Sequence, residues 1–345
     1  MSPGDSPRAE DTTVLLVRIL ITGAAGMVGR KLVERLVQDG ELGGARIAGL
    51  TLFDVVAPEP PSEPPFEVTA VAADLADDGV ASDLISSRPD VVFHLAAVVS
   101  GEAEADFEKG YRVNLDGTRS LFDAIRKLDG YRPRVVYTSS IAVFGPPFPD
   151  AIGDDFLTAP LTSYGTQKAI GELLLNDYSR RGFLDGIGIR LPTICVRPGA
   201  PNRAASGFFS SIVREPLLGE PAVLPVPDDL RHWHASPRAA VGFLLHAATM
   251  DTAALGDRRC LTMPGVSVTV AEQIEALRAV AGDDVVELIR REPDETVQRI
   301  VVTWPRRFDS QRARDLGFVA EESFEEIVRV HVEDELGGRL PAVSS

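Results

Sequence analysis

The sequence predicts an α/β fold in which a doubly wound parallel sheet is followed by a smaller, mixed region. Three observations support this prediction. Apolar runs of strand length alternate with amphipathic helical patterns, a glycine-rich turn joins the first strand to the first helix, and this regularity weakens beyond about Asp185. Strands that alternate with helices form parallel sheets, because each helix returns the chain to the same end of the sheet.

The expected elements follow one another in chain order. Strands are predicted in "VLLVRILITG", "RIAGLTLFD", "EVTAVAADL", "PDVVFHLAAVVS" and "PRVVYTSSIAVFG", and the first is followed by the helical pattern "MVGRKLVERLVQDG". The proline-rich stretch "APEPPSEPP" excludes helix and is expected to be a surface loop between two strands. Later, "GIGIRLPTICVRPG" and "RRCLTMPG" are expected as strands, and "FFSSIVREPLLG" and "PRAAVGFLLHAA" as helices.

These patterns divide the chain into three parts. Residues 1–13 are polar, acidic and proline-containing, lack the features of a signal peptide, and are expected to be disordered. Residues 14–185 hold the five regular strands, and residues 186–345 form the smaller region, which can contribute elements to the first domain. Ligands of open parallel sheets bind beyond the carboxyl ends of the strands, so the smaller region is placed to close over such a site.

Composition and charge argue against several classes of function. The formal charge of −16 over 345 residues disfavours nucleic acid as a partner. No apolar run approaches the roughly 20 residues that a membrane span requires. Cys195 and Cys260 stand far apart without metal-ligand spacing, so we expect neither a disulfide nor a metal site, and we interpret both as buried thiols in a reducing compartment. The sequence therefore predicts a cytoplasmic globular protein.

The turn "TGAAGMVG" carries the first functional signal, with Gly23, Gly26 and Gly29 between a buried strand and a helix. The first glycine allows the tight turn, the second lets backbone N–H groups approach a pyrophosphate, and the third lets the helix pack on the strand. Met27 and Val28 lie between the last two glycines and belong to the same predicted dinucleotide site. Residues 14–185 are therefore expected to be a Rossmann-type nucleotide-binding domain.

Asp54 ends the second strand, 25 residues after Gly29, where a carboxylate can accept hydrogen bonds from both ribose hydroxyls of the adenosine half. A 2′-phosphate there would meet a like charge, so the predicted cofactor is NAD.

Asp74 and Leu75 follow the third strand and can border the adenine, although Asp74 can equally be a plain helix-capping residue. After the fourth strand, Leu95, Ala96 and Ala97 leave room for the cofactor, whereas we interpret His94, inside that strand, as a core histidine.

A set of hydroxyl and amine groups follows the cofactor signals. Ser140 ends the fifth strand, 24 residues before Tyr164, and Lys168 follows Tyr164 by four residues on one helical face. A neighbouring ammonium favours the ionised phenol, so Lys168 can prepare Tyr164 as a general base while Ser140 hydrogen-bonds the reacting oxygen. The predicted chemistry is hydride transfer between a nicotinamide and an alcohol carbon.

Through this glycine turn and the Ser140, Tyr164 and Lys168 set, the chain resembles the extended short-chain dehydrogenase/reductase family. The resemblance implies a Rossmann fold, use of NAD(P) and a homodimer formed through two helices of each subunit. It also implies that Tyr164 is the acid/base, that Lys168 holds the nicotinamide ribose, and that Asn114 in "YRVNLDGT" supports the site. Pro192 and Ile194, in "LPTICVRPG", complete the expected cofactor contacts.

The substrate is predicted from longer stretches. Ser140 is followed by Ile141 and Ala142 instead of the acidic pair of sugar-nucleotide dehydratases, so dehydration is disfavoured. Four stretches resemble the D-erythronate dehydrogenase group of the family: "SGEAEADFEKGYRVNLDG", "SYGTQKAIGELLLNDYSRRGF", "LPTICVRPGAPN" and "RHWHASPRAAVGFLLHAA". This implies NAD-dependent oxidation of C2 of a small sugar acid to the 2-oxo acid, with residues 186–345 as the substrate-binding region.

Two other functions remain open. A nucleotide-sugar epimerase also lacks the acidic pair, and "RHWHAS" resembles the arginine-containing segment of such enzymes that approaches the substrate phosphates. A non-catalytic NAD-binding regulator is the second alternative, although such proteins often lose the tyrosine or the lysine, and both are intact here.

An anionic substrate in an acidic protein needs a fixed local cation, and the planar fork of arginine suits a carboxylate. The candidates are Arg197 and Arg231, of which the resemblance favours Arg231. Ser100 and Asn202 are candidates to hydrogen-bond the hydroxyl groups of the substrate. Each arginine can instead tie a loop to a backbone carbonyl. The predicted substrate contacts are thus Ser100, Ser140, Tyr164, Arg197, Asn202 and Arg231.

Overall fold

The computed structural model describes residues 15–199 and 206–340. Its largest layer is an eight-stranded sheet with the order β4-β3-β1-β5-β6-β7-β11, in which the short β2 pairs antiparallel with β3 and the other pairs are parallel. The strands are β1 (Leu16–Thr22), β2 (Glu41–Leu42), β3 (Ala45–Asp54), β4 (Glu67–Ala72), β5 (Val91–His94), β6 (Arg134–Ser140), β7 (Asp185–Leu191) and β11 (Cys260–Thr262). The order reverses between β1 and β5, as in dinucleotide-binding sheets.

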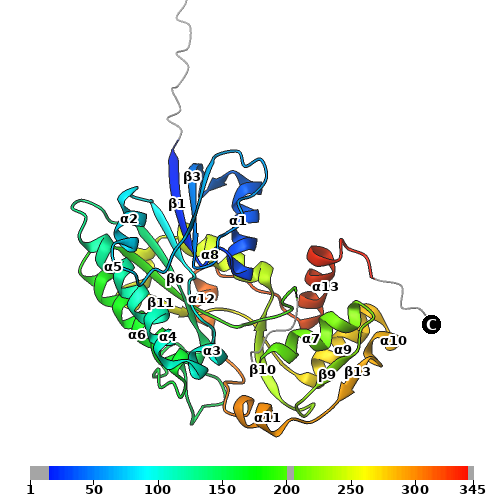
Figure 1. Ribbon diagram of the computed structural model, residues 1–345. Helices are drawn as coiled ribbons and strands as arrows, with labels where there is room; N and C mark the ends of the chain where they lie inside the picture. The colour runs from blue at the N-terminus through cyan, green and yellow to red at the C-terminus, as the bar shows by residue number, and fades with distance from the viewer. Residues whose placement is uncertain (1–14, 200–205, 341–345) are drawn as a thin grey trace, which may run out of the picture.

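Helices cover both faces of this sheet because each carries an apolar stripe (Figure 1). On one face lie α1 (Met27–Asp39) and α8 (Pro237–Thr249), and Leu32 and Leu36 of α1 are fully buried against the strands. On the other face lie α2 (Val80–Ser86), α5 (Gly117–Arg126) and α6 (Ser163–Arg180). Short elements follow β5 and β6: α3 (Ser100–Ala105), α4 (Phe107–Tyr111), a π-helix (Arg112–Asp116) and a 3-10 turn (Ile141–Val143).

A second core belongs to the smaller region, where α7, α9, α10 and α13 gather beside short strands (Figure 1). Its helices are α7 (Gly207–Leu217), α9 (Val270–Ala281), α10 (Asp283–Val286), α11 (Glu295–Val301) and α13 (Phe324–Glu335). The short α12 (Gln311–Asp315) and a 3-10 turn at Thr252–Leu255 pack against the main sheet instead. Its strands are β8 (Thr193–Ile194), β9 (Ala222–Leu224), β10 (Arg231–Ala235), β12 (Val266–Thr269) and β13 (Ile289–Arg291). They form two small sheets, β12-β10-β8 and β13-β9.

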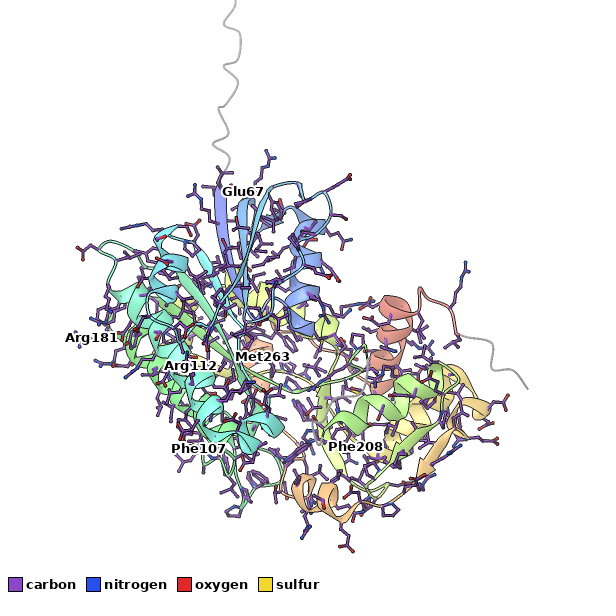
Figure 2. All side chains as sticks on the ribbon, in the orientation of Figure 1. Glu67, Phe107, Arg112, Arg181, Phe208 and Met263 are labelled. Atoms are coloured by element: carbon purple, nitrogen blue, oxygen red, sulfur yellow. The ribbon has the colours of Figure 1, made fainter. Side chains whose placement is uncertain are left out.

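The two cores are joined at the end of β11, where Met263 lies near the middle of the molecule (Figure 2). Met263 is fully buried; its N–H donates to the carbonyl of Arg190 (3.1 Å), and its carbonyl accepts from the indole of Trp233 (3.2 Å). The main sheet and β10 are therefore tied together through the backbone of one residue.

Most sequence-based expectations for the fold are confirmed. The doubly wound parallel sheet is present, the five expected strands appear as β1, β3, β4, β5 and β6, and residues 57–65 form a loop between β3 and β4. Cys195 and Cys260 are free, buried thiols. Within the described ranges, no helix is long and apolar enough to cross a membrane.

The expected division at residue 185 stays a prediction. β7 begins at Asp185 and joins the main sheet together with β11, and α8 packs on α1, so elements from the second part of the chain do contribute to the first layer. The expected disordered lead, residues 1–13, lies outside the described residues.

Helix α6 packs unusually close to the end of β6 because two of its residues lack a side chain. A Cβ at Gly165 would lie 2.2 Å from the carbonyl oxygen of Ala142, and a Cβ at Gly171 would lie 2.2 Å from the hydroxyl of the fully buried Tyr137. Both distances are too short for any real contact, so these glycines set the separation between the helix and the strand.

We predict that Gly171→Ala lowers the free energy of unfolding by about 1–3 kcal/mol, because the added methyl group must displace Tyr137 or the helix. The measurement is urea denaturation followed by circular dichroism. Gly242→Ala is the matched control: Gly242 lies exposed in α8, and beyond its own helix turn no atom of the described residues lies within 4 Å of the added Cβ. This substitution should be neutral or stabilising by up to about 1 kcal/mol. Equal effects of the two substitutions would contradict the packing argument.

Candidate active site

The glycine-rich turn leaves a cradle at the carboxyl end of β1. Gly23 has φ +79°, and a Cβ on it would lie 2.6 Å from the amide nitrogen of Ala96, while a Cβ on Gly29 would lie 2.3 Å from the carbonyl oxygen of Gly23. The N–H groups of Gly23 and Ala24 donate to the carbonyl of Phe53, which fixes the turn against β3 (2.8 and 3.1 Å). The N-terminus of α1, with Gly26, Met27 and Val28, opens onto this turn and suits a pyrophosphate.

Asp54 lies beside the cradle at the end of β3. Its carboxylate accepts from the N–H of Ala25 (3.0 Å) and from that of Val55 (2.7 Å), so the charge is fixed next to the turn. This is the geometry expected of a group that reads the adenosine ribose.

Asp74 makes structural contacts after β4. One carboxylate oxygen accepts from the N–H of Ala76 (2.9 Å), and the other pairs with Arg112 (3.1 Å), whose position Figure 2 marks. Leu75 is buried in the core beneath it. A contact of these two residues with adenine stays a prediction.

The segment after β5 borders the same edge. The N–H of Leu95 donates to the carbonyl of Thr22 (3.0 Å), and the N–H of Ala96 donates to its hydroxyl (3.4 Å), so Leu95, Ala96 and Ala97 leave the sheet beside the glycine turn. β1 and β5 are the neighbours between which the strand order reverses. The glycine turn, Asp54 and this segment thus meet at the point where such sheets bind dinucleotides. Because glycines and alanines line this point, there is space for the backbone of NAD.

His94 is a core residue, as the sequence indicated. One ring nitrogen is 2.7 Å from the hydroxyl of Thr22, and the other is 2.8 Å from that of Thr118. Burial, with a smaller contribution from the charge of Lys168, lowers the pKa of His94 to about 3. The ring is therefore neutral and hydrogen-bonded on both sides.

Tyr164 and Ser140 are brought together by the start of α6. The hydroxyl of Thr162 caps the helix by accepting from the N–H of Gly165 (3.1 Å), which places Tyr164 in the first turn. Gly165 packs on the 3-10 turn that follows Ser140, so the phenol lies close to the serine hydroxyl.

The pKa of Tyr164 departs from the expectation drawn from the sequence. Burial raises it, and the groups that act in the opposite direction are the hydroxyl of Ser140 and the charge of Arg197. Lys168 is itself buried: burial lowers its pKa to about 7, and the charge of Glu172 opposes that shift. The ammonium donates to the carbonyl of Thr138 (2.8 Å) and lies 5.9 Å from the centre of the Tyr164 ring.

Asn114 supports the site through its side chain. It accepts from the N–H of Val98 (2.8 Å) and donates to the carbonyl of Val98 (3.1 Å) and to the side chain of Gln167 (2.7 Å). The residue lies in the π-helix that precedes α5, and such insertions are frequent at functional sites. Asn114 therefore fixes the segment after β5 against α6, and Ser100 begins α3 directly beyond that segment.

Arg197 follows β8, close to Tyr164. Its backbone N–H donates to the hydroxyl of Ser210 (3.0 Å), and its Nε donates to the carbonyl of Ile194 (3.1 Å). Within the described residues, no carboxylate forms a salt bridge with it. Pro192 and Ile194 are buried just before it, and Asn202 lies outside the described residues.

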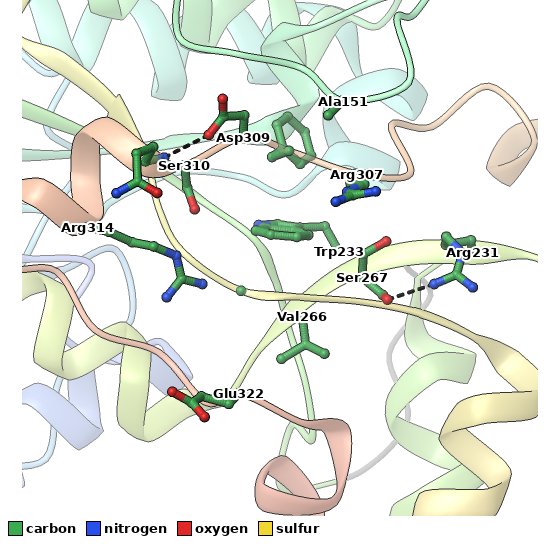
Figure 3. Close-up of a pocket in the computed structure, with 13 residues that line it drawn as sticks. Ala151, Arg231, Trp233, Val266, Ser267, Arg307, Asp309, Ser310, Arg314 and Glu322 are labelled. Atoms are coloured by element: carbon green, nitrogen blue, oxygen red, sulfur yellow. Dashed lines mark hydrogen bonds between the residues drawn. The ribbon is translucent and has the colours of Figure 1, made fainter.

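Arg231 lies in a different environment. It donates to the carbonyl of Ser267 (2.7 Å) and pairs with Glu272 (3.1 Å). Together with Trp233, Arg307 and Arg314, it lines a cavity of about 620 Å³ (Figure 3). Ser140, Tyr164 and Lys168 are not among the residues that line this cavity.

Sequence reasoning missed three buried residues behind Lys168, namely Ser139, Glu172 and Arg190. They form a hydrogen-bonded cluster that joins β6, α6 and β7. Two signals pointed to it: Glu172 follows Lys168 by four residues, and Arg190 interrupts the apolar strand "GIGIRL", where a charge must be paired.

A glycine cradle at the switch point of a parallel sheet, with a Ser, Tyr and Lys at the same edge, defines a Rossmann-type NAD-binding oxidoreductase. Residues 19–236 match the NAD dependent epimerase/dehydratase family. The chain therefore belongs to this family of extended short-chain dehydrogenases/reductases, and it is an NAD-dependent enzyme.

Two similar proteins are named D-erythronate dehydrogenase. The one from Cupriavidus necator is 49% identical over 322 residues, which span 92% of this chain and 98% of the relative. The one from Haemophilus influenzae is 41% identical over 317 residues, which span 92% of this chain and 99% of that relative.

Solved structures give the same fold. A protein from Agrobacterium tumefaciens described as a nucleoside-diphosphate-sugar epimerase is 63% identical, with a TM-score of 0.95 over 98% of this chain and 100% of that one. An L-threonine dehydrogenase from Cupriavidus necator has a TM-score of 0.77 over 92% of this chain and 99% of that one; at 24% identity, it supports the fold alone.

We predict that NAD exceeds NADP in kcat/KM by at least about tenfold, because the 2′-phosphate of NADP would meet the fixed carboxylate of Asp54. Asp54→Asn keeps an oxygen that can accept from Ala25 but removes the charge, so it should narrow this preference. Asp74→Asn, which alters a carboxylate already paired with Arg112, should leave the preference unchanged. Steady-state rates with both cofactors provide the measurement, and an unchanged ratio in Asp54→Asn would show that Asp54 does not read the ribose.

Proposed function

We propose that this enzyme uses NAD to oxidise the C2 hydroxyl of a small sugar acid such as D-erythronate, giving the 2-oxo acid. The two relatives named D-erythronate dehydrogenase support this proposal, because each matches this chain over nearly its whole length. The observation that carries it is the position of Arg197, whose charge acts on Tyr164.

The chemistry of a 2-hydroxy acid explains why this position matters. C2 is bonded directly to the carboxylate carbon, so the group that binds the carboxylate must lie within a few ångströms of the group that removes the hydroxyl proton. The charge of Arg197 acts on Tyr164, which favours Arg197 for this role, whereas Arg231 is paired with Glu272 beside another cavity. We therefore place the carboxylate at Arg197, although the sequence favoured Arg231.

The roles of the other residues follow from balancing the reaction. NAD, when bound, would supply the acceptor for the hydride that leaves C2. Tyr164 takes the hydroxyl proton, and Ser140 donates a hydrogen bond to the same oxygen as it becomes a carbonyl. Lys168, as a cation, favours the ionised phenol and holds the nicotinamide ribose, and Asn114 keeps the segment after β5 in place for the cofactor.

We further propose a cytoplasmic homodimer that assembles through α5 and α6. Leu175 of α6 packs fully into the core, whereas Leu173 is 67% exposed on the outer side of the helix. Light scattering of the purified protein tests the dimer, and a monomeric mass would refute it.

A nucleotide-sugar epimerase is the second candidate, because the Agrobacterium tumefaciens protein at 63% identity carries that description. One experiment separates the candidates. The purified protein is incubated with NAD and a panel of four- to six-carbon aldonates, and separately with nucleotide sugars. NADH release with an aldonate supports the proposal; interconversion of a nucleotide sugar supports the epimerase; neither reaction, with NAD still bound, supports a regulator.

We predict that Tyr164→Phe lowers kcat by about 10² or more while NAD still binds, because the substitution removes the oxygen that takes the proton but keeps the ring. The rate comes from NADH absorbance, and NAD binding comes from a fluorescence titration. Near-normal turnover in this variant would remove Tyr164 from the mechanism.

We also predict that Arg197→Met raises KM for the sugar acid by a factor that corresponds to about 1.5–3 kcal/mol, the usual value of a hydrogen bond to a charged group. The dissociation constant for NAD should change little. Arg231→Met is the matched variant, since it removes the same side chain from a site that is paired with Glu272. A larger rise in KM for Arg231→Met would return the carboxylate to Arg231.

A further inference from the structure

A buried carboxylate stands one helical turn beyond the lysine of the active site. Glu172 follows Lys168 by four residues in α6, and both residues are buried (relative exposures of 4% and 3%). Residues at this spacing lie on the same helical face with their Cβ atoms about 5–6 Å apart. The ammonium and the carboxylate therefore share one interior region.

The carboxylate of Glu172 is held rigidly. One oxygen accepts from the hydroxyl of Ser139 (2.5 Å) and from Nε of Arg190 (2.9 Å), and the other accepts from a terminal nitrogen of Arg190 (2.7 Å). The guanidinium also lies 4.9 Å from the ring of Phe144. Because the guanidinium of Arg190 holds both carboxylate oxygens, the orientation of the Glu172 side chain is a fixed feature of the site.

Stability alone does not explain such a cluster. Buried ion pairs cost so much desolvation that apolar residues of similar volume are often as stable or more so. The cluster is not even fully satisfied: among the residues that the structure describes, one terminal nitrogen of Arg190 has no hydrogen-bond partner, and the carboxylate of Asp154 lies 3.9 Å from it. A functional reason for the charge is therefore worth testing.

The surroundings of Lys168 supply that reason. The ionisable groups that interact with Lys168 are His94 of β5, Tyr137 of β6, and Tyr164 and Glu172 of α6. Around Glu172 and its partner Arg190 of β7 lie Cys260 of β11 and Asp154 of the loop before α6. His94 is neutral, and burial raises the pKa values of Tyr137 and Cys260, so these groups carry no charge near neutral pH. Glu172 is the group whose negative charge offsets the burial of the ammonium.

We propose that Glu172 is a positioning residue, clamped by Arg190 and Ser139, which keeps Lys168 protonated inside the active site. This inference rests on the proposed function only for the reason that Lys168 must be charged. A neutral Lys168 could neither favour the ionised Tyr164 nor act as a cation beside the ribose. Glu172 itself touches neither substrate nor cofactor and acts through Lys168.

The composition of the chain allows a direct test. It contains four lysines, Lys31, Lys109, Lys127 and Lys168, so protein labelled with ¹³C-lysine gives four sets of side-chain signals, and Lys168→Arg identifies that of Lys168. Titrating these signals follows the protonation of Lys168 without any turnover. In Glu172→Gln, which keeps the shape of the side chain, the midpoint for Lys168 should fall by about one unit or more, a tenfold loss of proton affinity.

Ser139→Ala is the matched control, because it removes one contact of Glu172 but keeps its charge. In Ser139→Ala, the titration midpoint of Lys168 should shift by less than about half as much as it does in Glu172→Gln. An unchanged midpoint in Glu172→Gln, or an equal shift in Ser139→Ala, would overturn the proposal.

Glu172→Gln leaves Arg190 unpaired and can fail to fold. In that case Arg190→Met is compared with Arg190→Met/Glu172→Gln, and the titration midpoint of Lys168 should be lower in the second protein.

Activity provides a separate readout. The alkaline limb of the kcat profile with NAD and D-erythronate should move to lower pH in Glu172→Gln, because Lys168 loses its proton earlier. If the wild-type protein does not oxidise any aldonate, the proposed function fails, but the NMR titration still decides the role of Glu172. An unmoved limb in an active Glu172→Gln enzyme would count against that role.

Discussion

The site depends on how closely α6 packs against the end of β6. Gly165 and Gly171 remove the side chains that would hold the two apart, and Thr162 fixes where the helix begins. At this separation, three side chains of the helix meet three successive residues of the strand. The pairs are Tyr164 with Ser140, Lys168 with Thr138, and Glu172 with Ser139. Tyr164, the proposed proton acceptor, and the side chains of Lys168 and Glu172 are thus positioned by a single helix–strand contact.

The cofactor edge meets this contact because of the strand order. β1 and β5 are neighbours at the point where the order reverses, and β6 follows β5 directly, so the glycine turn and Ser140 lie at the same end of the sheet. Asn114 ties the segment after β5 to Gln167, the residue before Lys168. The cofactor edge and the catalytic helix are therefore held as one unit by side chains that need not touch the reacting atoms.

Features that depend on local pattern could be predicted from the sequence, whereas features that depend on burial could not. The turn from Gly23 to Gly29 and the strand ending at Asp54 are set by short stretches whose backbone requirements are visible in the residues themselves. The pKa of Tyr164 rises because burial outweighs neighbouring charges, and no spacing rule measures burial. The partner of Arg231 lies 41 residues away in the chain, so its pairing was equally invisible.

The region after β7 was harder to assign for a related reason. β7 and β11 complete the main sheet although 68 residues separate them, from Leu191 to Cys260, and the second core is built partly by the chain between them and partly by the chain after β11. Arg190 shows the same effect within one strand. In the sequence it is an isolated charge in an apolar run, and only the fold brings it against Glu172 from another element.

The charges of Arg197, Lys168 and Glu172 must be considered together because the protein as a whole is acidic. A protein with a formal charge of −16 attracts anions poorly, so an acidic substrate must find its cations locally. Arg197 and Lys168 can supply them, but burial acts on the two cations differently: an arginine stays charged, whereas a buried lysine readily loses its proton. In the proposed mechanism Lys168 must stay a cation, and Glu172 places a buried carboxylate one helical turn from it. The hydrogen bonds from Arg190 and Ser139 fix that carboxylate in the interior, where it does not expose a negative charge to the substrate.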